Sequence, residues 1–401
     1  MVPNGWTLNN FNSVAELIHG FQFREHHFSE SGVPIVKIAS ISHLRGVSLE
    51  KCSYISEEIA SEFSKYQIEA GDVLMALTGG TLGKTCKVQE DIEICLQNYR
   101  VGNFKPKASF LDKDFLYYFL ISFTVQKKIE NIVNEAAQPN VGKADFDKIK
   151  VLTPPLPEQR KIAKILGTWD KAISTTERLI DNSKQQKKAL MQQLLTGKKR
   201  FAGFSKDWKQ IHLGDIGKCI TGLTYKPTDT VDDGVLVLRS SNIQNSKLTF
   251  KDNVFVNADL KIKSKTQEND ILVCVRNGSK NLIGKSTLIK GRAVGQAHGA
   301  FMTLFRGKHP SYVSQLFQSS EFFRQVNMNL GATINSINTS DLHKFKFTIP
   351  TDEDEINAIA SCLSNAENEI EILQQQLADL KLEKKALMQQ LLTGKRRVTV
   401  N

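Results

Sequence analysis

The sequence predicts an α+β protein made of two similar domains, each followed by a long helix. The first observation is a twelve-residue segment, KKALMQQLLTGK, which occurs at 187–198 and again unchanged at 384–395. The second is a set of strand-like runs that recur in both halves, and the third is a pair of long segments with a regular apolar seam. A repeat of about 200 residues indicates duplication of one structural unit.

Strand-like segments occur in the same order in both halves. Each run is rich in apolar residues, and several follow the Gly, Asn or Asp residues that are typical of turns leading into strands. We also match Gln97 with Gln296, while the loops between the runs diverge almost completely. One framework that presents different loops is therefore expected. The matched pairs are 5–8 with 207–213, 33–38 with 235–239, 70–76 with 268–274, and 149–154 with 345–350.

Each half is predicted to end in one long helix, from Glu158 to about Leu195 and from Glu355 to about Leu392. Apolar residues three and four positions apart form a heptad seam in both, although Thr176, Ser183 and Lys187 interrupt the first. We expect the seams to bury each other; helices that pack only on their own domains are the alternative. The predicted seam residues are Ile162, Leu166, Trp169, Ile173, Ile180, Leu190, Leu194, Ile359, Leu363, Ile370, Leu373, Leu377, Leu380, Leu387 and Leu391.

These patterns divide the chain into four segments. We expect a first domain at 1–155, a helix at 156–198, a second domain at 199–350 and a second helix at 351–401. A helix of this length extends for roughly 55 Å at about 1.5 Å per residue, which is typical of a strut rather than of a helix buried in one small domain.

Composition favours an intracellular protein with a polyanionic partner. The chain has 401 residues, a net charge of +11 and a pI of about 9.2, and a basic balance of this kind favours nucleic acid. No apolar run is long enough to cross a membrane, and 1–5 is not a signal peptide. The six cysteines form no CxxC pair, so we expect reduced thiols rather than a disulfide framework or a metal site.

Motifs that resemble catalytic or nucleotide sites do not have the required spacing. A phosphate-binding loop needs four residues between its first glycine and the Gly-Lys pair. The loops at 78–85 and 278–286 miss this spacing. No Asn/Asp-Pro-Pro-aromatic site for amino methylation occurs, and His26 and His27 lack partners at metal-ligand spacing. We therefore predict no catalytic residue and no metal ligand in this chain.

Polar loop residues are the remaining candidates for chemistry. Arginine pairs with guanine and Asn or Gln with adenine, whereas Lys, Ser and Thr hold phosphates; an ordinary surface loop has a similar composition. Among the candidates, we expect Arg276, Asn277, Gln296 and Asn335 to include base readers, and Lys84, Lys143 and Lys280 to contact mainly phosphate. The candidate DNA-binding residues are Thr81, Lys84, Gln97, Asn98, Tyr99, Arg100, Gln138, Asn140 and Lys143 in the first half, and Arg276, Asn277, Ser279, Lys280, Gln296, His298, Asn335, Ser336 and Asn338 in the second.

With these features in place, the chain resembles the DNA specificity subunit of type I restriction-modification enzymes. The resemblance rests on PPLPEQRKIAKIL at 154–166, on both ALMQQLLTG segments, and on FAGF at 201–204 followed by Trp208 and LGDI at 213–216. It covers nearly the whole chain. The second helix departs from the Pro-x-x-Glu-Gln start, because 350–356 reads PTDEDEI.

The resemblance implies a non-catalytic subunit whose two target recognition domains each read one half of a bipartite, asymmetric DNA site. It implies that the helices pack antiparallel as a spacer, which gives pseudo-twofold symmetry. Two modification subunits would bring S-adenosylmethionine and adenine methylation, and two restriction subunits would bring ATP and Mg-dependent translocation and cleavage. The chain itself would carry no cofactor, contact no membrane and act in the cytoplasm of a bacterial or archaeal cell.

Two alternatives remain open at this point. One is the specificity subunit of a related methyltransferase–nuclease that does not translocate DNA, and the presence of an ATP-dependent motor in the native complex distinguishes it. The other is a protein-interaction scaffold without base readout, which predicts weak sequence preference for the assembled complex.

Overall fold

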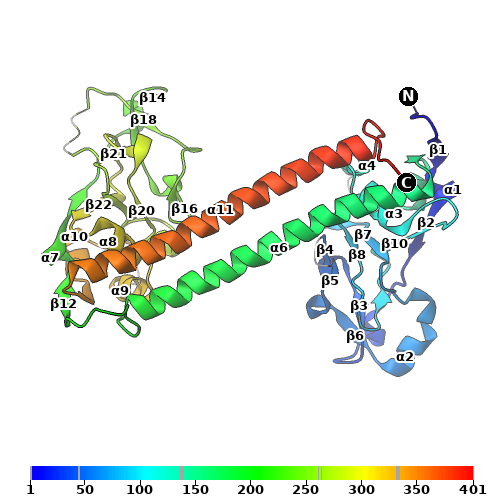
Figure 1. The fold of residues 1–401 in the computed structure, drawn as a ribbon, viewed down its shortest axis with the longest axis horizontal. Coiled ribbons are helices and arrows are strands. Elements are labelled where there is room, and N and C mark those ends of the chain that lie inside the picture. Colours follow the sequence, from blue (N-terminus) through cyan, green and yellow to red (C-terminus); the bar gives the residue numbers. More distant parts are fainter. Residues whose placement is uncertain are drawn as a thin grey trace. The chain divides into compact units, whose positions relative to one another are not determined.

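The computed structural model describes residues 2–43, 46–135, 140–260, 262, 264–330 and 335–400. Contacts divide the chain into two compact units: unit 1 contains Met1–Arg178 and Gln375–Asn401, and unit 2 contains Leu179–Gln374. Each unit therefore combines one globular half with one end of each long helix. The predicted α+β class is confirmed, because strands and helices occur in both units (Figure 1). The division into four consecutive segments stays a prediction.

Unit 1 is built on the four-stranded sheet β2-β10-β7-β8, to which the smaller sheets β6-β3-β9, β1-β11 and β4-β5 are added. Its strands are β1 (Thr7–Asn10), β2 (Ala15–His19), β3 (Val33–Val36), β4 (Ile41–Ser42), β5 (Gly46–Val47), β6 (Ser53–Ile55), β7 (Val73–Ala76), β8 (Thr85–Lys87), β9 (Leu96–Gln97), β10 (Val101–Pro106) and β11 (Lys150–Thr153). Its short helices are α1 (Phe11–Val14), α2 (Glu57–Glu62), α3 (Lys113–Leu120), α4 (Phe123–Glu135) and α5 (Lys143–Asp147).

Unit 2 repeats this plan with the sheets β13-β22-β19-β20, β14-β18-β15-β21, β12-β23 and β16-β17. Its strands are β12 (Trp208–His212), β13 (Gly217–Thr221), β14 (Thr230–Val231), β15 (Val235–Leu238), β16 (Ile243–Gln244), β17 (Lys247–Leu248), β18 (Phe255–Val256), β19 (Ile271–Cys274), β20 (Ser286–Leu288), β21 (Ala297–His298), β22 (Met302–Gly307) and β23 (Lys346–Pro350). Its short helices are α7 (Leu213–Ile216), α8 (Pro310–Leu316), α9 (Ser320–Asn329) and α10 (Thr339–His343).

The central strands β7 and β19 are fully buried in both units. A strand that is covered on both faces reads as a continuous apolar run, which explains the sequences VLMA and ILVC. The helices that cover the sheets bury aromatic residues against them, among them Phe115 on α3 and Phe317 just after α8. The two cores are therefore separate and similarly placed.

The strand register corrects one match that we made from the sequence. In unit 1, β9 runs parallel to β3 and places Gln97 opposite Val36. In unit 2, β21 runs parallel to β15 and places His298 opposite Leu238. Because Val36 and Leu238 both end the equivalent strands, His298 is the counterpart of Gln97, and the match with Gln296 was wrong.

The two long helices are α6 (Leu156–Leu194) and α11 (Glu353–Leu391), close to the predicted bounds. Glycines with positive φ follow each one, Gly197 at 69° and Gly394 at 67°, as expected for residues that end helices. All the predicted seam residues are buried or half-buried, so the sequence period matches the burial period. The polar interruptions Thr176 and Ser183 are buried along the same stripe.

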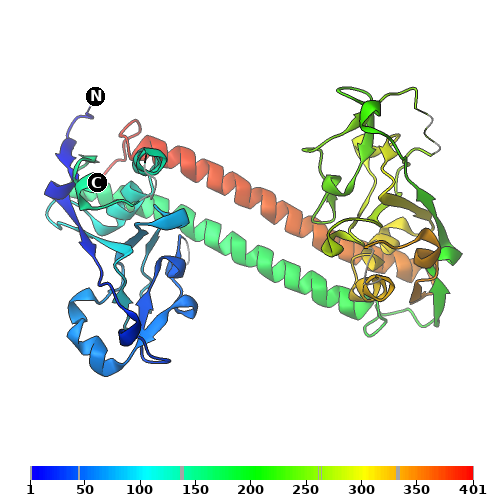
Figure 2. The same cartoon turned by 180° about the vertical axis from the view of Figure 1, so that it is seen from behind.

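Within each unit, ion pairs join the end of α6 to the end of α11. In unit 1, Lys384 binds Asp170 and Lys381 binds Glu177. In unit 2, Lys187 lies 3.3 Å from Glu367, and Ser183 donates to Glu369. As the residue number of the α6 partner increases, that of its α11 partner decreases. The helix ends are therefore antiparallel within each unit, as Figure 2 also shows for each unit taken separately.

Candidate nucleic-acid interface

Three segments that are far apart in the sequence meet at one end of the main sheet in unit 1. The Leu77 amide donates to the Arg100 carbonyl, and the Val141 amide donates to the Leu77 carbonyl, at 2.9 and 3.0 Å. Thr78 and Asn140 are bridged next to them. The loop after β7, the turn before β10 and the segment before α5 thus form one surface, which we call edge 1. It contains the candidates Thr81, Lys84, Asn98, Tyr99, Arg100, Asn140 and Lys143.

Unit 2 forms the equivalent surface, edge 2, with the same backbone bonds. The Val275 amide donates to the Phe301 carbonyl and the Ile337 amide to the Val275 carbonyl, at 3.0 and 2.8 Å. Arg276 and Ser336 are bridged next to them. Edge 2 contains the candidates Arg276, Asn277, Ser279, Lys280, Asn335, Ser336 and Asn338. The sheet thus gathers most of the residues that the sequence singled out.

On edge 1, Arg100 is exposed and lies over the ring of Tyr99, with 5.3 Å between guanidinium carbon and ring centroid. Its Nε donates to the Tyr99 hydroxyl at 2.8 Å. Asn98 is buried and accepts the Arg100 amide with its side-chain oxygen at 3.2 Å. We therefore assign Asn98 to shaping the turn, while Arg100 projects from it.

On edge 2, Arg276 is exposed and lies 5.8 Å from the ring centroid of Phe301, which is itself 56% exposed. The Asn277 amide donates to the Ser240 hydroxyl at 3.1 Å, and the Asn335 amide donates to the Gly278 carbonyl at 3.1 Å. These bonds fix the loop that carries Arg276. Beside it lies a hollow of about 420 Å³ lined by Arg239, Ser240, Ser241, Tyr225 and Phe301, among others.

Two of the candidate DNA-binding residues are buried and are corrected on that ground. Gln97 and His298 are each 1% exposed. The Gln97 amide donates to the carbonyls of Ile18 and Val101, and the His298 ring bonds the Ile220 carbonyl. These side chains bond backbone carbonyls of the sheet rather than face a ligand, so neither is positioned to contact DNA.

Two further candidates have other outcomes. Gln296 is half-buried, and its oxygen accepts the Leu236 amide at 2.9 Å, so only part of its amide is available. Gln138 lies outside the described residues.

Three residues at edge 2 were not predicted from the sequence: Arg239, Ser240 and Phe301. Arg239 ends the predicted strand 235–239 and Ser240 directly follows it, which is the one signal that pointed to them.

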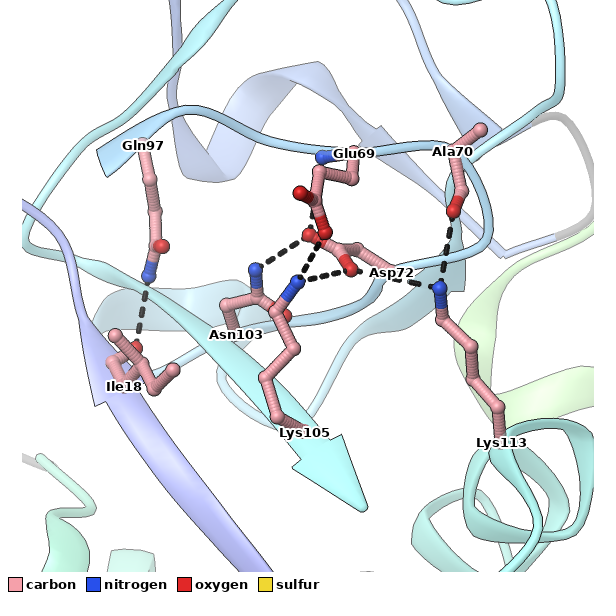
Figure 3. A network of polar contacts seen from close by, with 8 residues as sticks. All are labelled: Ile18, Glu69, Ala70, Asp72, Gln97, Asn103, Lys105 and Lys113. Atoms are coloured by element: carbon pink, nitrogen blue, oxygen red, sulfur yellow. Dashed lines mark hydrogen bonds and ion pairs between the residues drawn. The ribbon is translucent and has the colours of Figure 1, made fainter. Parts of the chain in front are cut away.

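Buried carboxylates hold the turns that lead into β7 and β19. Figure 3 shows Asp72, which accepts hydrogen bonds from Lys105 and Asn103 at 2.6 and 2.7 Å and lies 3.6 Å from Lys113. The equivalent Asp270 accepts two hydrogen bonds from Arg306, both at 2.7 Å. These networks position the strands whose far ends carry the two edges.

The loops that resembled phosphate-binding loops have a different role in the fold. The segment after β7 leads into β8, and the segment after β19 leads into β20, so each connects two antiparallel strands. A phosphate-binding loop leads into a helix, whose N-terminus faces the phosphate. These two loops therefore lack the helix that a phosphate-binding loop leads into.

The described residues contain no group of three or more His, Cys, Asp or Glu that could hold a metal ion. Burial raises the pKa of Cys86, Cys95 and Cys219 to about 12, so these thiols are not reactive nucleophiles. In the same part of the chain, no helix is both long and apolar enough to cross a membrane.

A second pair of surfaces lies where the repeated segment ends each long helix. Groove 1, in unit 1, has a volume of about 560 Å³, and groove 2, in unit 2, about 820 Å³. Both are lined by the same five repeat positions and by a lysine on the neighbouring strand, Lys150 or Lys346. The repeat positions are Lys385, Met388, Gln389, Leu392 and Thr393 in groove 1, and Lys188, Met191, Gln192, Leu195 and Thr196 in groove 2.

Comparisons with known proteins agree with this architecture. The model of the type I restriction modification DNA specificity domain matches residues 3–183 and 205–382. The type I restriction enzyme MjaVIII specificity subunit of Methanocaldococcus jannaschii is 26% identical over 86% of this chain and 85% of that protein. The fold also matches the type I restriction-modification S subunit of M. genitalium, with a TM-score of 0.63 and 14% identity over 98% of this chain and 97% of that one.

A further solved structure, from work on complex assembly and conformational transition of the type I R-M system, covers 99% of this chain and 100% of its own, with a TM-score of 0.60 and 17% identity. The chain therefore shares the fold of these two solved proteins. The chain belongs to the family of type I restriction-modification DNA specificity domains. Its role is to supply DNA sequence specificity in a restriction-modification system.

Proposed function

We propose that edge 1 and edge 2 each read one component of a bipartite, asymmetric DNA site, and that the chain itself catalyses no reaction. The observation that carries this proposal is that the two units share sheet order and strand register, yet present different side chains at the same end of the sheet. Readers that share a framework but differ in their loops are suited to two different sequences. The net charge of +11 favours the phosphate contacts that such binding needs.

Exchange of one unit's globular part tests this proposal. We expect that replacing residues 1–150 with the equivalent part of a relative changes one component of the methylated sequence and leaves the other unchanged. The measurement is sequencing of modified bases in DNA exposed to the assembled complex. A matched exchange of 205–350 should change only the other component. If either exchange alters both components together, independent reading by the two edges is excluded.

We also propose that grooves 1 and 2 dock two copies of one modification subunit, which brings S-adenosylmethionine and methylates adenine. Two docking sites with five identical side chains are suited to two identical partners, and the exposed Phe123 and Phe323 add apolar area to grooves 1 and 2. Restriction subunits would add ATP-driven translocation and cleavage. Relatives of this chain come from archaea and bacteria, whose DNA lies in the cytoplasm, so we also propose a cytoplasmic complex.

Equivalent surface lysines allow a matched test of docking. Lys188 and Lys385 are exposed and occupy the same repeat position, so charge reversal should leave the fold intact. We expect K188E and K385E each to lower the occupancy of one modification subunit, and the double variant to lower both. Native mass spectrometry reads the stoichiometry. Full occupancy in the double variant would remove the grooves from the interface.

The long helices are proposed to set the gap between the two components. Four residues inserted between Thr176 and Ile180 add about 6 Å along α6 at 1.5 Å per residue. Duplex DNA rises about 3.4 Å per base pair, so the gap in the methylated sequence should grow by roughly one or two base pairs. Modification of the original site at the original rate would show that the helices do not act as a ruler.

A further inference from the structure

Each edge carries one exposed arginine stacked on an aromatic ring. On edge 1, Arg100 lies 5.3 Å from the Tyr99 ring centroid, and on edge 2, Arg276 lies 5.8 Å from the Phe301 centroid. A ring beneath a guanidinium restricts its orientation. The Phe301 ring takes no N–H of Arg276, and the Tyr99 hydroxyl takes the Nε–H of Arg100 but leaves both Nη groups. At both edges the planar guanidinium group therefore faces a ligand in a limited set of orientations.

The two pairs come from different segments: Tyr99 and Arg100 both precede β10, whereas Arg276 follows β19 and Phe301 precedes β22. The Arg100 and Phe301 carbonyls accept equivalent amides, those of Leu77 and Val275, so Arg100 and Phe301 occupy the same position in the two units. Unit 2 places its aromatic residue where unit 1 has its arginine, and takes its arginine from the loop after β19. An arginine–aromatic pair is thus present at both edges, although the two arginines occupy different positions in their units and so do the two aromatic residues.

Neither arginine has a structural partner for its charge in the part of the chain that the structure describes. Arg200, Arg306 and Arg397 all bind carboxylates of the framework. By contrast, among the described residues the Arg100 guanidinium interacts with the Tyr99 ring and hydroxyl, and the Arg276 guanidinium with the Phe301 ring, without a carboxylate partner. The two Nη groups of Arg100 and the guanidinium of Arg276 are therefore available to a ligand.

We propose that Arg100 and Arg276 each read a guanine, so that both components of the bipartite site contain a guanine recognised from the major groove. Two parallel N–H groups of arginine match the N7 and O6 acceptors of guanine, and no other base presents two acceptors there in this arrangement. Tyr99 and Phe301 are positioning residues that hold the guanidinium groups. This inference rests on the proposed function of the two edges.

The test uses the chain assembled with its modification subunits and duplexes that carry the mapped site. R276A should weaken binding to the cognate site by roughly 5- to 150-fold and lose the guanine preference at one position of one component. R100A should do the same in the other component only. R276K keeps the charge but not the fork, and should also lose the preference. F301A should lose it in part and add little to R276A.

Arg292 is the matched control, because its guanidinium also lies over a ring, 4.0 Å from the centroid of Phe250. It follows the last residue of β20, whereas the edge 2 loop leads into the first residue of that strand. R292A should leave the guanine preference unchanged. Replacing the contacted guanine with 7-deazaguanine removes the N7 acceptor alone. It should weaken binding of the unchanged protein several-fold and have no effect on R276A.

The outcomes separate this inference from the function on which it rests. If the assembled complex shows no sequence preference, the proposed function fails. If it is specific but one component lacks guanine, or if R100A and R276A weaken all sequences equally, the guanine assignment is overturned while the proposed function stands. Loss of one guanine preference per variant, with the 7-deazaguanine effect abolished, supports it.

Discussion

Units 1 and 2 hold the same buried carboxylate with different cations. In unit 1, Asp72 shares its charge among Lys105, Lys113 and Asn103 (Figure 3). In unit 2, Arg306 supplies two hydrogen bonds to Asp270 and is its one cationic partner among the described residues. The backbone position of the carboxylate is preserved because it accepts an amide at the turn before the central strand, from Glu69 or Gln267. The turn fixes the position of the carboxylate in both units, and its negative charge is neutralised by two lysines in unit 1 and by an arginine in unit 2.

This difference predicts unequal sensitivity to loss of the cation. R306A should destabilise unit 2 by about 3–5 kcal/mol, because it leaves a buried carboxylate without its charged partner. K105A should cost unit 1 less, about 1–2 kcal/mol, since Lys113 and Asn103 remain. Peptide-resolved hydrogen exchange over β7 and β19 measures both. Equal losses of stability in R306A and K105A would show that Lys113 does not compensate for the loss of Lys105.

The starts of the two long helices form a second contrast. In unit 1, Glu158 accepts the Trp6 indole at 3.0 Å and two bonds from Arg397. In unit 2, Arg200 binds Glu355 at 2.8 and 2.7 Å, but the buried Trp208 indole nitrogen has no partner among the described residues. The tryptophan is kept in both units, while its hydrogen bond is present in one.

Matched tryptophan substitutions measure this contrast. W6F should destabilise unit 1 by about 1.5–3 kcal/mol through the lost bond to a charged acceptor, in addition to lost packing. W208F loses similar packing but no hydrogen bond, so its cost should be smaller. Denaturant unfolding followed by exchange in each unit provides the comparison. A W208F cost as large as that of W6F would mean that ring volume, not the bond, dominates.

Glu158 also makes unit 1 sensitive to acid. Burial alone would raise its pKa, but hydrogen bonds from Arg397 and Trp6 outweigh this and hold the pKa of Glu158 below 4.5. A carboxylate whose folded pKa is lowered stabilises the fold above its unfolded pKa, and this contribution is lost as pH falls through the folded value. Unit 1 should therefore lose stability below about pH 4.5, and E158Q should lose that part of the pH dependence. An unchanged acid profile in E158Q would exclude this source.

Local periodicity made the framework predictable. The bounds of α6 and α11 and the central strands follow from patterns within a few residues, and burial of Thr176 and Ser183 follows from their place on the seam. The edges were predicted as loops for the same reason. Gln97 and His298 were misjudged because their partners, Ile18 and Ile220, lie 79 and 78 residues away. Only strand pairing determines that contact.

Phe301 shows the opposite error. An aromatic residue beside a strand is usually assigned to the core, yet this one is 56% exposed. Its exposure depends on the turn that brings its carbonyl to Val275, and no local pattern encodes that turn. Side chains of the reading edges are thus the hardest to predict, since they are set by the meeting of distant segments.

The exchange of Gln97 for its counterpart His298 leads to the smallest expected effect. Burial lowers the pKa of His298 below 6.5, and its bond to the Ile220 carbonyl offsets this only in part. A histidine that is neutral when folded stabilises the fold above its unfolded pKa, and this contribution falls away as pH drops below about 6.5 toward the folded value. The slope for one proton is at most about 1.4 kcal/mol per pH unit.

H298Q installs the side chain that unit 1 uses at the same register position, and its amide can still donate to the Ile220 carbonyl. We expect unit 2 of H298Q to keep its fold and its stability at pH 8, and to lose stability less steeply between pH 6.5 and 5. The reverse variant, Q97H, should introduce that slope into unit 1, because the site is equally buried. Hydrogen exchange at a series of pH values, corrected for the intrinsic rate, measures both slopes. If the pH dependence of unit 2 stability persists in H298Q, it arises from another group. His298 and Gln97 would then be equivalent only in their register position.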